Sequence, residues 1–170
     1  MKTADDFVQA YKNVRRECER FALFVARDRE LAADYLQEAL TAAFAALRRI
    51  DDAGALKSYV MRAVLRQHRR SSSRAQKIEL ADMDLLRCPA YANAEETTDA
   101  QLVRDAIANL PDDQRIPLVL AEIEGWPLAD IAAELGLGLS AVKMRIKRGR
   151  DTVIEQLREQ PVTKDNVDHE

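Results

Sequence analysis

The sequence predicts an all-α protein of two small helical domains, a helical bundle and a helix-turn-helix domain, joined by a flexible linker. Apolar residues recur at helical spacing along most of the chain, Ala, Leu, Glu, Arg and Gln are abundant, and runs of β-branched residues are scarce. Residues 74–96 lack a sustained period, which is typical of a linker. We therefore expect the first domain at residues 1–73, the second at 97–158, and a disordered polar tail at 159–170.

Three helices are expected in the first domain, at about residues 4–27, 30–48 and 55–70. Turn formers and a glycine in residues 51–54 separate the second helix from the third, and Ser71–Ser73 is expected to end the bundle. The apolar residues at helical spacing are Phe7, Val8, Tyr11, Val14, Cys18, Phe21 and Ala22, then Ala33, Leu36, Leu40, Ala43, Phe44 and Leu47, then Leu56, Tyr59, Val60, Ala63 and Val64. Together these faces could close a small bundle.

After a linker with a short helix near residues 81–86, the second domain is expected to start with a helix from Thr97, closed by Leu110-Pro111. Another helix follows from Asp112 to Glu124 and stops at a glycine, and Pro117 is expected to distort its first turn.

Positive charge is clustered in this chain although the net charge is −3. Residues 57–77 hold seven Lys or Arg and no acid, and residues 143–150 hold five Lys or Arg and no acid. One such cluster could be a solvated helix face, but two in one acidic chain favour binding to nucleic acid.

The rest of the composition predicts a cytoplasmic protein without a cofactor or metal. Cys18 and Cys88 are 70 residues apart in the sequence, and with His68 and His169 they lack metal-ligand spacing. We expect both thiols to be reduced and structural. No apolar run reaches membrane-spanning length, and the acidic N-terminus does not resemble a signal peptide. The sequence shows no paired carboxylates, nucleophile triad or phosphate loop. An enzyme is therefore the least favoured hypothesis.

The last third of the sequence has the pattern of a helix-turn-helix. Residues 127–135 predict a short helix, Gly136 supplies a left-handed turn, and a second helix starts near Leu139 or Ser140. Val142, Ile146 and Gly149 share the inner face of that second helix. The opposite stripe, which we expect to enter the major groove, consists of Ser140, Lys143, Met144, Lys147 and Arg148. Arg145 and Arg150 point off this stripe and would bind phosphates or stabilise the fold.

These residues resemble the fourth conserved region of bacterial sigma factors. The likeness lies in Leu110, Pro111, Gln114, Arg115, Gly125, Ile131, Ala132, Leu135, Gly136, Val142, Lys143, Arg145, Arg148, Gly149 and Arg150. In that family the region binds the minus-35 promoter element. The resemblance therefore implies minus-35 binding by Ser140, Lys143, Met144, Arg145, Lys147 and Arg148.

The first domain is similar to the second region of the same family. Residues 33–40 resemble the segment that meets the clamp helices of the RNA polymerase largest subunit, which implies core polymerase binding by Asp34, Gln37, Glu38 and Thr41. Residues 56–63 resemble the helix that bears on the minus-10 element, which implies minus-10 binding by Tyr59, Arg62, Arg66, Arg69 and Arg70. His68 is a further candidate for base contacts, and Tyr59 could instead be a core residue.

Some positions depart from the family pattern. Tyr59 stands where relatives usually have Trp, Arg66 where they have Asn, and Ile50-Asp51-Asp52 where they have a Phe-Arg-Gly-like run. Acidic residues near single-stranded DNA would repel phosphate, so these departures bear on how the minus-10 bases are read.

The two-region layout is similar to the extracytoplasmic-function (ECF) class of alternative sigma factors. It implies a protein that binds core RNA polymerase, at the clamp helices and the flap, and promoter DNA, and that directs promoter-specific transcription initiation. An anti-sigma factor is a further implied partner, so the chain would be a monomer when free or a heterodimer with that factor. Two alternatives stay open: a stand-alone helix-turn-helix regulator, and a sigma mimic that titrates an anti-sigma factor.

Overall fold

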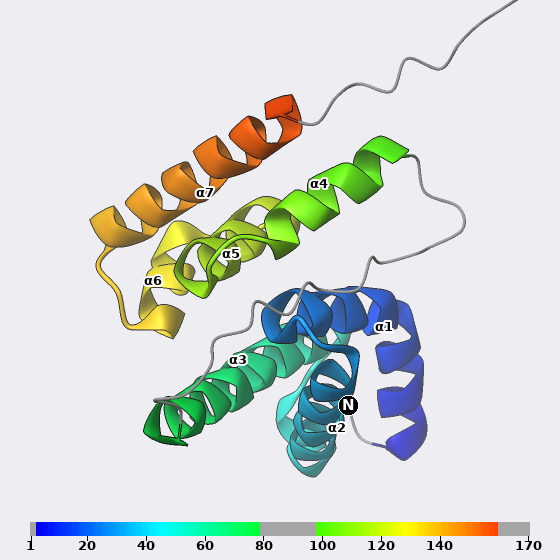
Figure 1. Cartoon of the computed structure of the whole chain (residues 1–170). Coiled ribbons are helices and arrows are strands. Elements are labelled where there is room, and N and C mark those ends of the chain that lie inside the picture. The colour runs from blue at the N-terminus through cyan, green and yellow to red at the C-terminus, as the bar shows by residue number, and fades with distance from the viewer. Residues whose placement is uncertain (1–2, 79–97, 160–170) are drawn as a thin grey trace, which may run out of the picture.

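The computed structural model describes residues 3–78 and 98–159, which we call the first half and the second half (Figure 1). The first half contains α1 (Ala4–Ala26), α2 (Arg29–Ala45), the 3₁₀ turn η1 (Leu47–Arg49) and α3 (Ala53–Ile78). The second half contains α4 (Thr98–Ala108), α5 (Asp112–Leu118), the π-helical turn η2 (Val119–Ile123), α6 (Leu128–Leu135) and α7 (Leu139–Glu159). The predicted all-α fold class is confirmed. The expected helix at 81–86 and the tail from 160 lie outside the described residues.

Polar side chains at the N-terminal ends of the three helices of the first half bind backbone N–H groups that have no partner within the helix. The Thr3 hydroxyl accepts from the Asp6 N–H at 3.1 Å, and the Asp6 carboxylate accepts from the Thr3 N–H in return. Asp28 accepts from the Leu31 N–H at 2.8 Å, and Asp52 accepts from the Ala55 N–H at 2.8 Å. Asp52, one of the two acids that depart from the family pattern, therefore starts α3.

The expected end of the third helix was wrong. Helix α3 continues past Ser71–Ser73 to Ile78. Serine is only mildly unfavourable inside a helix, and the following Arg74-Ala75-Gln76-Lys77 are good helix formers, so three serines do not stop it.

The expected inner faces of the first two helices were partly wrong. Val8, Ala33 and Phe44 are exposed. The buried residues of α2 are instead Ala32, Tyr35, Leu36, Ala39 and Ala43. This face closes against α1 and α3, while the Phe44 ring stays outside and packs edge-on against Phe7, with ring centroids 5.4 Å apart.

Helix α7 packs along α4, α5 and α6 in the second half (Figure 1). Pro117 lies inside α5, but the distortion follows it instead of affecting the first turn. In the wider turn η2, the Glu124 N–H donates to the Val119 carbonyl at 3.0 Å, and the Trp126 N–H donates to the Leu120 carbonyl at 2.9 Å. Gly125, at a φ of 67°, then ends this stretch as expected.

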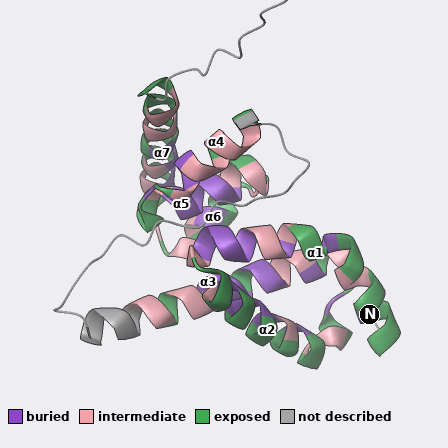
Figure 2. Cartoon of the chain, turned by 45° about the vertical axis from the view of Figure 1, so that its right-hand side comes forward, coloured by how far each residue is buried: buried purple, intermediate pink, exposed green. Residues whose placement is uncertain are grey.

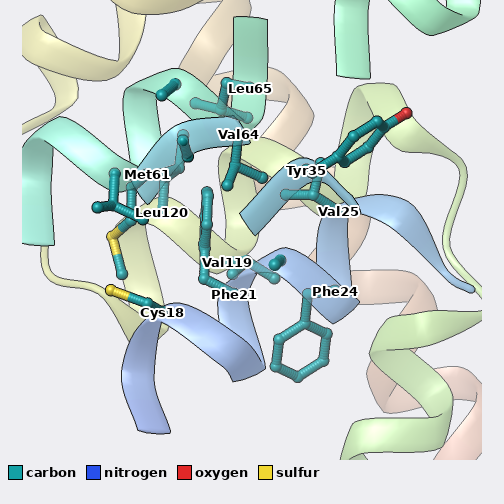
Figure 3. Packing of buried hydrophobic residues seen from close by; sticks show 14 of the residues in the cluster. Cys18, Phe21, Phe24, Val25, Tyr35, Met61, Val64, Leu65, Val119 and Leu120 are labelled. Carbon is teal, nitrogen blue, oxygen red and sulfur yellow. The ribbon is translucent and has the colours of Figure 1, made fainter. Parts of the chain in front are cut away.

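The two halves share one hydrophobic core. Figure 2 shows buried residues where α1 and α5 meet, and Figure 3 shows the packing in close-up. Residues of one continuous buried cluster come from α1, α3 and η2; they include Cys18, Phe21, Phe24, Met61, Val64, Leu65, Val119 and Leu120. The sequence predicted two domains, and the described residues pack them against each other.

Candidate nucleic-acid interface

The α6–turn–α7 unit has the geometry of a helix-turn-helix. Pro127 precedes the first helical residue of α6 in an extended conformation. Gly136 ends α6 in the left-handed region, at a φ of 65° and a ψ of 35°. The Leu137 N–H donates back to the Ala132 carbonyl at 2.9 Å, so one of the last carbonyls of α6 is satisfied and the chain turns sharply into α7.

The predicted DNA-reading stripe of α7 is exposed. Val142, Ile146 and Gly149 are buried against the rest of the second half. The opposite side presents Ser140, Lys143, Met144, Lys147 and Arg148, all exposed. Met144 has 52% of its surface accessible, which places an exposed thioether among the basic side chains of the stripe.

Arg145 and Arg150 lie apart from this stripe, as expected from their spacing. Arg150 Nη2 lies 2.6 Å from the Glu122 Oε1 of η2, so it ties α7 to its own half. Arg145 is half-buried and lines a cavity between the two halves. It is therefore less available to DNA than the other predicted minus-35 residues.

The predicted minus-10 residues divide into two groups on α3. Arg66 and Tyr59 lie together, with the guanidinium 6.0 Å from the ring centroid, and the half-buried Tyr59 donates to the Ala42 carbonyl at 3.4 Å. Arg62 and Arg69, one helical face of α3, instead point to the second half. Arg70 is exposed.

The predicted polymerase-binding residues of α2 form an exposed polar stripe. Asp34, Gln37, Glu38 and Thr41 are all exposed, and the Thr41 hydroxyl donates to the Gln37 carbonyl at 2.8 Å. This spacing places the four side chains on one side of α2, opposite the face that packs on α3. The stripe is accessible in the arrangement of the two halves seen here.

A buried arginine connects the halves. Arg115 of α5 is 0% exposed. It donates to the carbonyls of Phe24 at 2.7 Å and Val25 at 3.3 Å in the last turn of α1, and to the Leu110 carbonyl at 2.6 Å. Its Nη2 also lies 2.5 Å from the Asp112 carboxylate. A guanidinium suits this place because the last carbonyls of a helix lack partners and carry negative partial charge.

Asp112 also binds the first half. Its Oδ2 lies 2.6 Å from His68 Nε2 of α3. Burial alone would raise the pKa of Asp112, but the hydrogen bond with His68 and the charge of Arg115 outweigh it and lower the pKa to about 2. His68 has only 13% of its side chain accessible, so the proposed base contact by His68 is not available in this arrangement.

Glu124 and Glu134 complete the contact between the halves. The Glu124 side chain is 1% exposed, and its oxygens lie 3.2 Å from Lys57 Nζ of α3 and 3.5 Å from Arg20 Nη2 of α1. Glu134, at the end of α6, pairs with Arg62 and Arg69. Beside these pairs lies a cavity of about 380 Å³, whose polar lining residues are His68, Arg69, Ser72, Asp112, Asp113 and Arg145.

The contacts between the halves were not predicted from the sequence. Arg115 could have been noticed because it directly precedes the apolar run of residues 116–121, where a charge needs partners. Nothing in the sequence signals that Glu124 and Glu134 face α3, because their partners lie more than 60 positions away in the sequence.

The described residues contain no cluster of three or more His, Cys, Asp and Glu side chains suited to a metal ion. Within the same residues, no helix combines the length and apolar character that crossing a membrane requires. Cys18 is fully buried, and burial together with the charges of Glu17 and Glu124 raises the pKa of its thiol to about 12. Cys88 lies outside the described residues.

Comparisons with known proteins agree with this geometry. Residues 100–153 match the family model described as sigma-70, region 4. The chain is 28% identical over 153 residues to the ECF RNA polymerase sigma factor EcfG of Rhodopseudomonas palustris, covering 86% of this chain and 80% of that protein. It is 29% identical over 147 residues to the ECF RNA polymerase sigma factor SigM of Mycobacterium tuberculosis, covering 85% of this chain and 73% of that protein.

The chain is similar to sigma factors of the ECF class over most of its length. The region 4 match runs from α4 into α7 and contains α6, the turn and α7 as far as residue 153. The fold also resembles a solved structure, the sigma factor RpoE in complex with the anti-sigma factor NepR from Bartonella quintana. That likeness has a TM-score of 0.71 and 21% sequence identity, and it covers 92% of this chain and 99% of that one.

Proposed function

We propose that this chain binds core RNA polymerase and directs transcription initiation at specific promoters, as an alternative sigma factor. One observation carries the proposal: a helix-turn-helix with an exposed basic stripe lies in a chain that aligns over most of its length with ECF sigma factors. The polymerase supplies the chemistry of RNA synthesis, and the chain supplies recognition, so no catalytic residue is assigned to it. The place of action is the cytoplasm, where the polymerase works.

We assign the minus-35 element to the exposed stripe of α7. Lys143, Lys147 and Arg148 would reach base edges or phosphates, and Ser140 could donate a hydrogen bond. The exposed Met144 would make an apolar contact such as that with a thymine methyl group. Arg145, which lies beside the cavity, would contribute a phosphate contact only when the halves separate.

The first half would bind the polymerase and the minus-10 element. The stripe of Asp34, Gln37, Glu38 and Thr41 fits a basic partner helix, as the resemblance to the clamp-binding segment implies. Tyr59 and Arg66, which lie together on α3, would stack on or pair with an exposed base, and Arg62, Arg69 and Arg70 would bind the DNA backbone. An anti-sigma factor is the further partner that this assignment implies.

Run-off transcription with core polymerase on a library of genomic promoters tests the proposal. We expect specific transcripts that are lost with Lys143→Glu, because a carboxylate on the stripe repels phosphate. Arg158→Glu is the matched control: it reverses the same charge on the same helix, roughly 22 Å along the axis at 1.5 Å per residue. Asp34→Ala should abolish transcripts by weakening polymerase binding, while Glu155→Ala should not.

The alternatives give different results. A stand-alone regulator would leave a sequence-specific footprint without polymerase, and a sigma mimic would keep its effect after Lys143→Glu. Absence of transcripts, together with absence of polymerase binding in a pull-down, would overturn the proposal.

A further inference from the structure

Carboxylates of the second half lie against the cationic side chains of α3. Glu134 Oε1 lies 2.9 Å from Arg69 Nη2, which also donates to the Glu134 carbonyl at 2.6 Å. The other oxygen, Oε2, lies 3.6 Å from Arg62 Nε. The Arg62 guanidinium in turn lies 5.3 Å from the ring centroid of Trp126. One carboxylate and one aromatic ring of the second half therefore engage two arginines that face in the same direction from α3.

The same arrangement repeats along α3. Lys57, near its start, pairs with Glu124 as well as with Glu17 of its own half, and His68, further along, pairs with Asp112. The carboxylates come from three different places in the second half: the beginning of α5, the turn after η2 and the end of α6. The carboxylates therefore lie against a row of basic side chains, in the places that phosphates of a nucleic acid strand would take.

We propose that the free chain is self-masked: the second half closes over α3 and its Glu134 occupies the arginines, Arg62 and Arg69, that would otherwise contact promoter DNA. This inference rests on the proposed function, because it assigns those arginines to DNA. The mask is reversible at Glu134, since Arg62 and Arg69 keep 48% and 46% of their side chains exposed and such pairs bind weakly. The polymerase and the promoter, which bind both halves, would supply the contacts that replace the shared core.

Binding of a fluorescein-labelled single-stranded 20-nucleotide DNA to the free, full-length chain tests the mask. Glu134→Gln should bind this DNA about threefold to tenfold more tightly than the unmodified chain, because two arginines lose their partner. With two further phosphate contacts, the slope of log affinity against log salt concentration should become more negative by about 1.4. Trp126 is the single tryptophan of the chain, so acrylamide quenching of its fluorescence reports the contact with Arg62, and quenching should increase in Glu134→Gln.

Glu19→Gln is the matched control. It removes the same charge, but from a pair with Arg15 within α1 of the first half. It should leave DNA affinity, salt slope and Trp126 quenching close to those of the unmodified chain. Adding Arg69→Gln to Glu134→Gln should remove most of the gain in affinity, and circular dichroism checks that each variant is folded.

Equal DNA affinity and salt slope in Glu134→Gln and Glu19→Gln would overturn the mask, even if run-off transcription supports the sigma factor function. A gain in affinity that survives Arg69→Gln would also overturn it. Conversely, a gain specific to Glu134→Gln would support the mask, whereas failure of the run-off assay would count against the sigma factor function alone.

Discussion

Arg115 connects the two halves through a guanidinium that is fully buried between them. A buried charge is costly unless it is paired and hydrogen-bonded, and here three backbone carbonyls and a carboxylate accept from it. Two of those carbonyls end α1, so a side chain of the second half satisfies the C-terminus of a helix of the first half.

Arg115→Met tests that role, since it keeps the apolar stem and removes the donors. We expect the free energy of unfolding to fall by about 2–4 kcal/mol, because the carbonyls of Phe24, Val25 and Leu110 lose a charged partner. Urea denaturation measures it. Arg16→Met, on the exposed side of α1, is the control and should change stability by less than about 0.5 kcal/mol. A similar small change in Arg115→Met would contradict the role.

Asp112 predicts a pH dependence of stability. Its pKa in the folded chain is lowered to about 2, below the value of about 3.9 for an unfolded aspartate. The unfolded chain therefore binds the proton more readily, and the stabilisation is present above about pH 4 and lost as the pH falls through about 2. The melting temperature of Asp112→Asn should lie below that of the unmodified chain at pH 6, and this gap should close by about pH 2. Asp113→Asn removes the same charge one position further and serves as the control. A gap that stays constant across this range would contradict the assignment.

At the scale of elements, the helix-turn-helix depends on a few local signals. Gly136 adopts a left-handed conformation that L side chains rarely adopt, and small or apolar residues on either side of it keep α6 and α7 in contact. Such features lie within about ten residues of one another, so the turn and the exposed stripe of α7 could be predicted from the sequence. The end of α3 could not, because the serines are weak signals in either direction.

Gly136→Ala should destabilise the second half by about 1–2 kcal/mol. No atom lies within 4 Å of the Cβ that the substitution adds, so the cost comes from the backbone conformation alone. Gly136→Asn is the matched control, because asparagine also adds a side chain but adopts the left-handed conformation more readily than alanine. Thermal unfolding followed by circular dichroism measures the difference, and equal effects of the two substitutions would contradict this explanation.

For the molecule as a whole, the shared core predicts that the two halves unfold together. Val119 and Leu120 of η2 are buried in the same cluster as Phe21 of α1 and Val64 of α3. Separating the halves would expose this apolar surface, at about 25 cal/mol per Å². The halves are therefore coupled when the chain is free.

Urea unfolding monitored by two spectroscopic signals tests this prediction. Trp126 fluorescence reports the second half and its contact with Arg62, and far-UV circular dichroism reports all helices. We expect the two transitions to coincide within error, as for a cooperative unit. Leu120→Ala should move both to lower urea by weakening the common core. A fluorescence transition that clearly precedes the loss of helix would show instead that the halves separate first.

The sequence by itself determined the helical class, the helix-turn-helix and the exposed stripes of α2 and α7. These depend on apolar spacing, turn residues and charge within single elements, which short stretches of sequence encode. Only the tertiary structure decided that Arg115 is buried under α1, that Glu134 engages Arg62 and Arg69, and that His68 faces Asp112. These contacts join residues that are 44 to 91 positions apart in the sequence. Local periodicity cannot predict them, because it does not show which distant charges will lie close together in the folded chain.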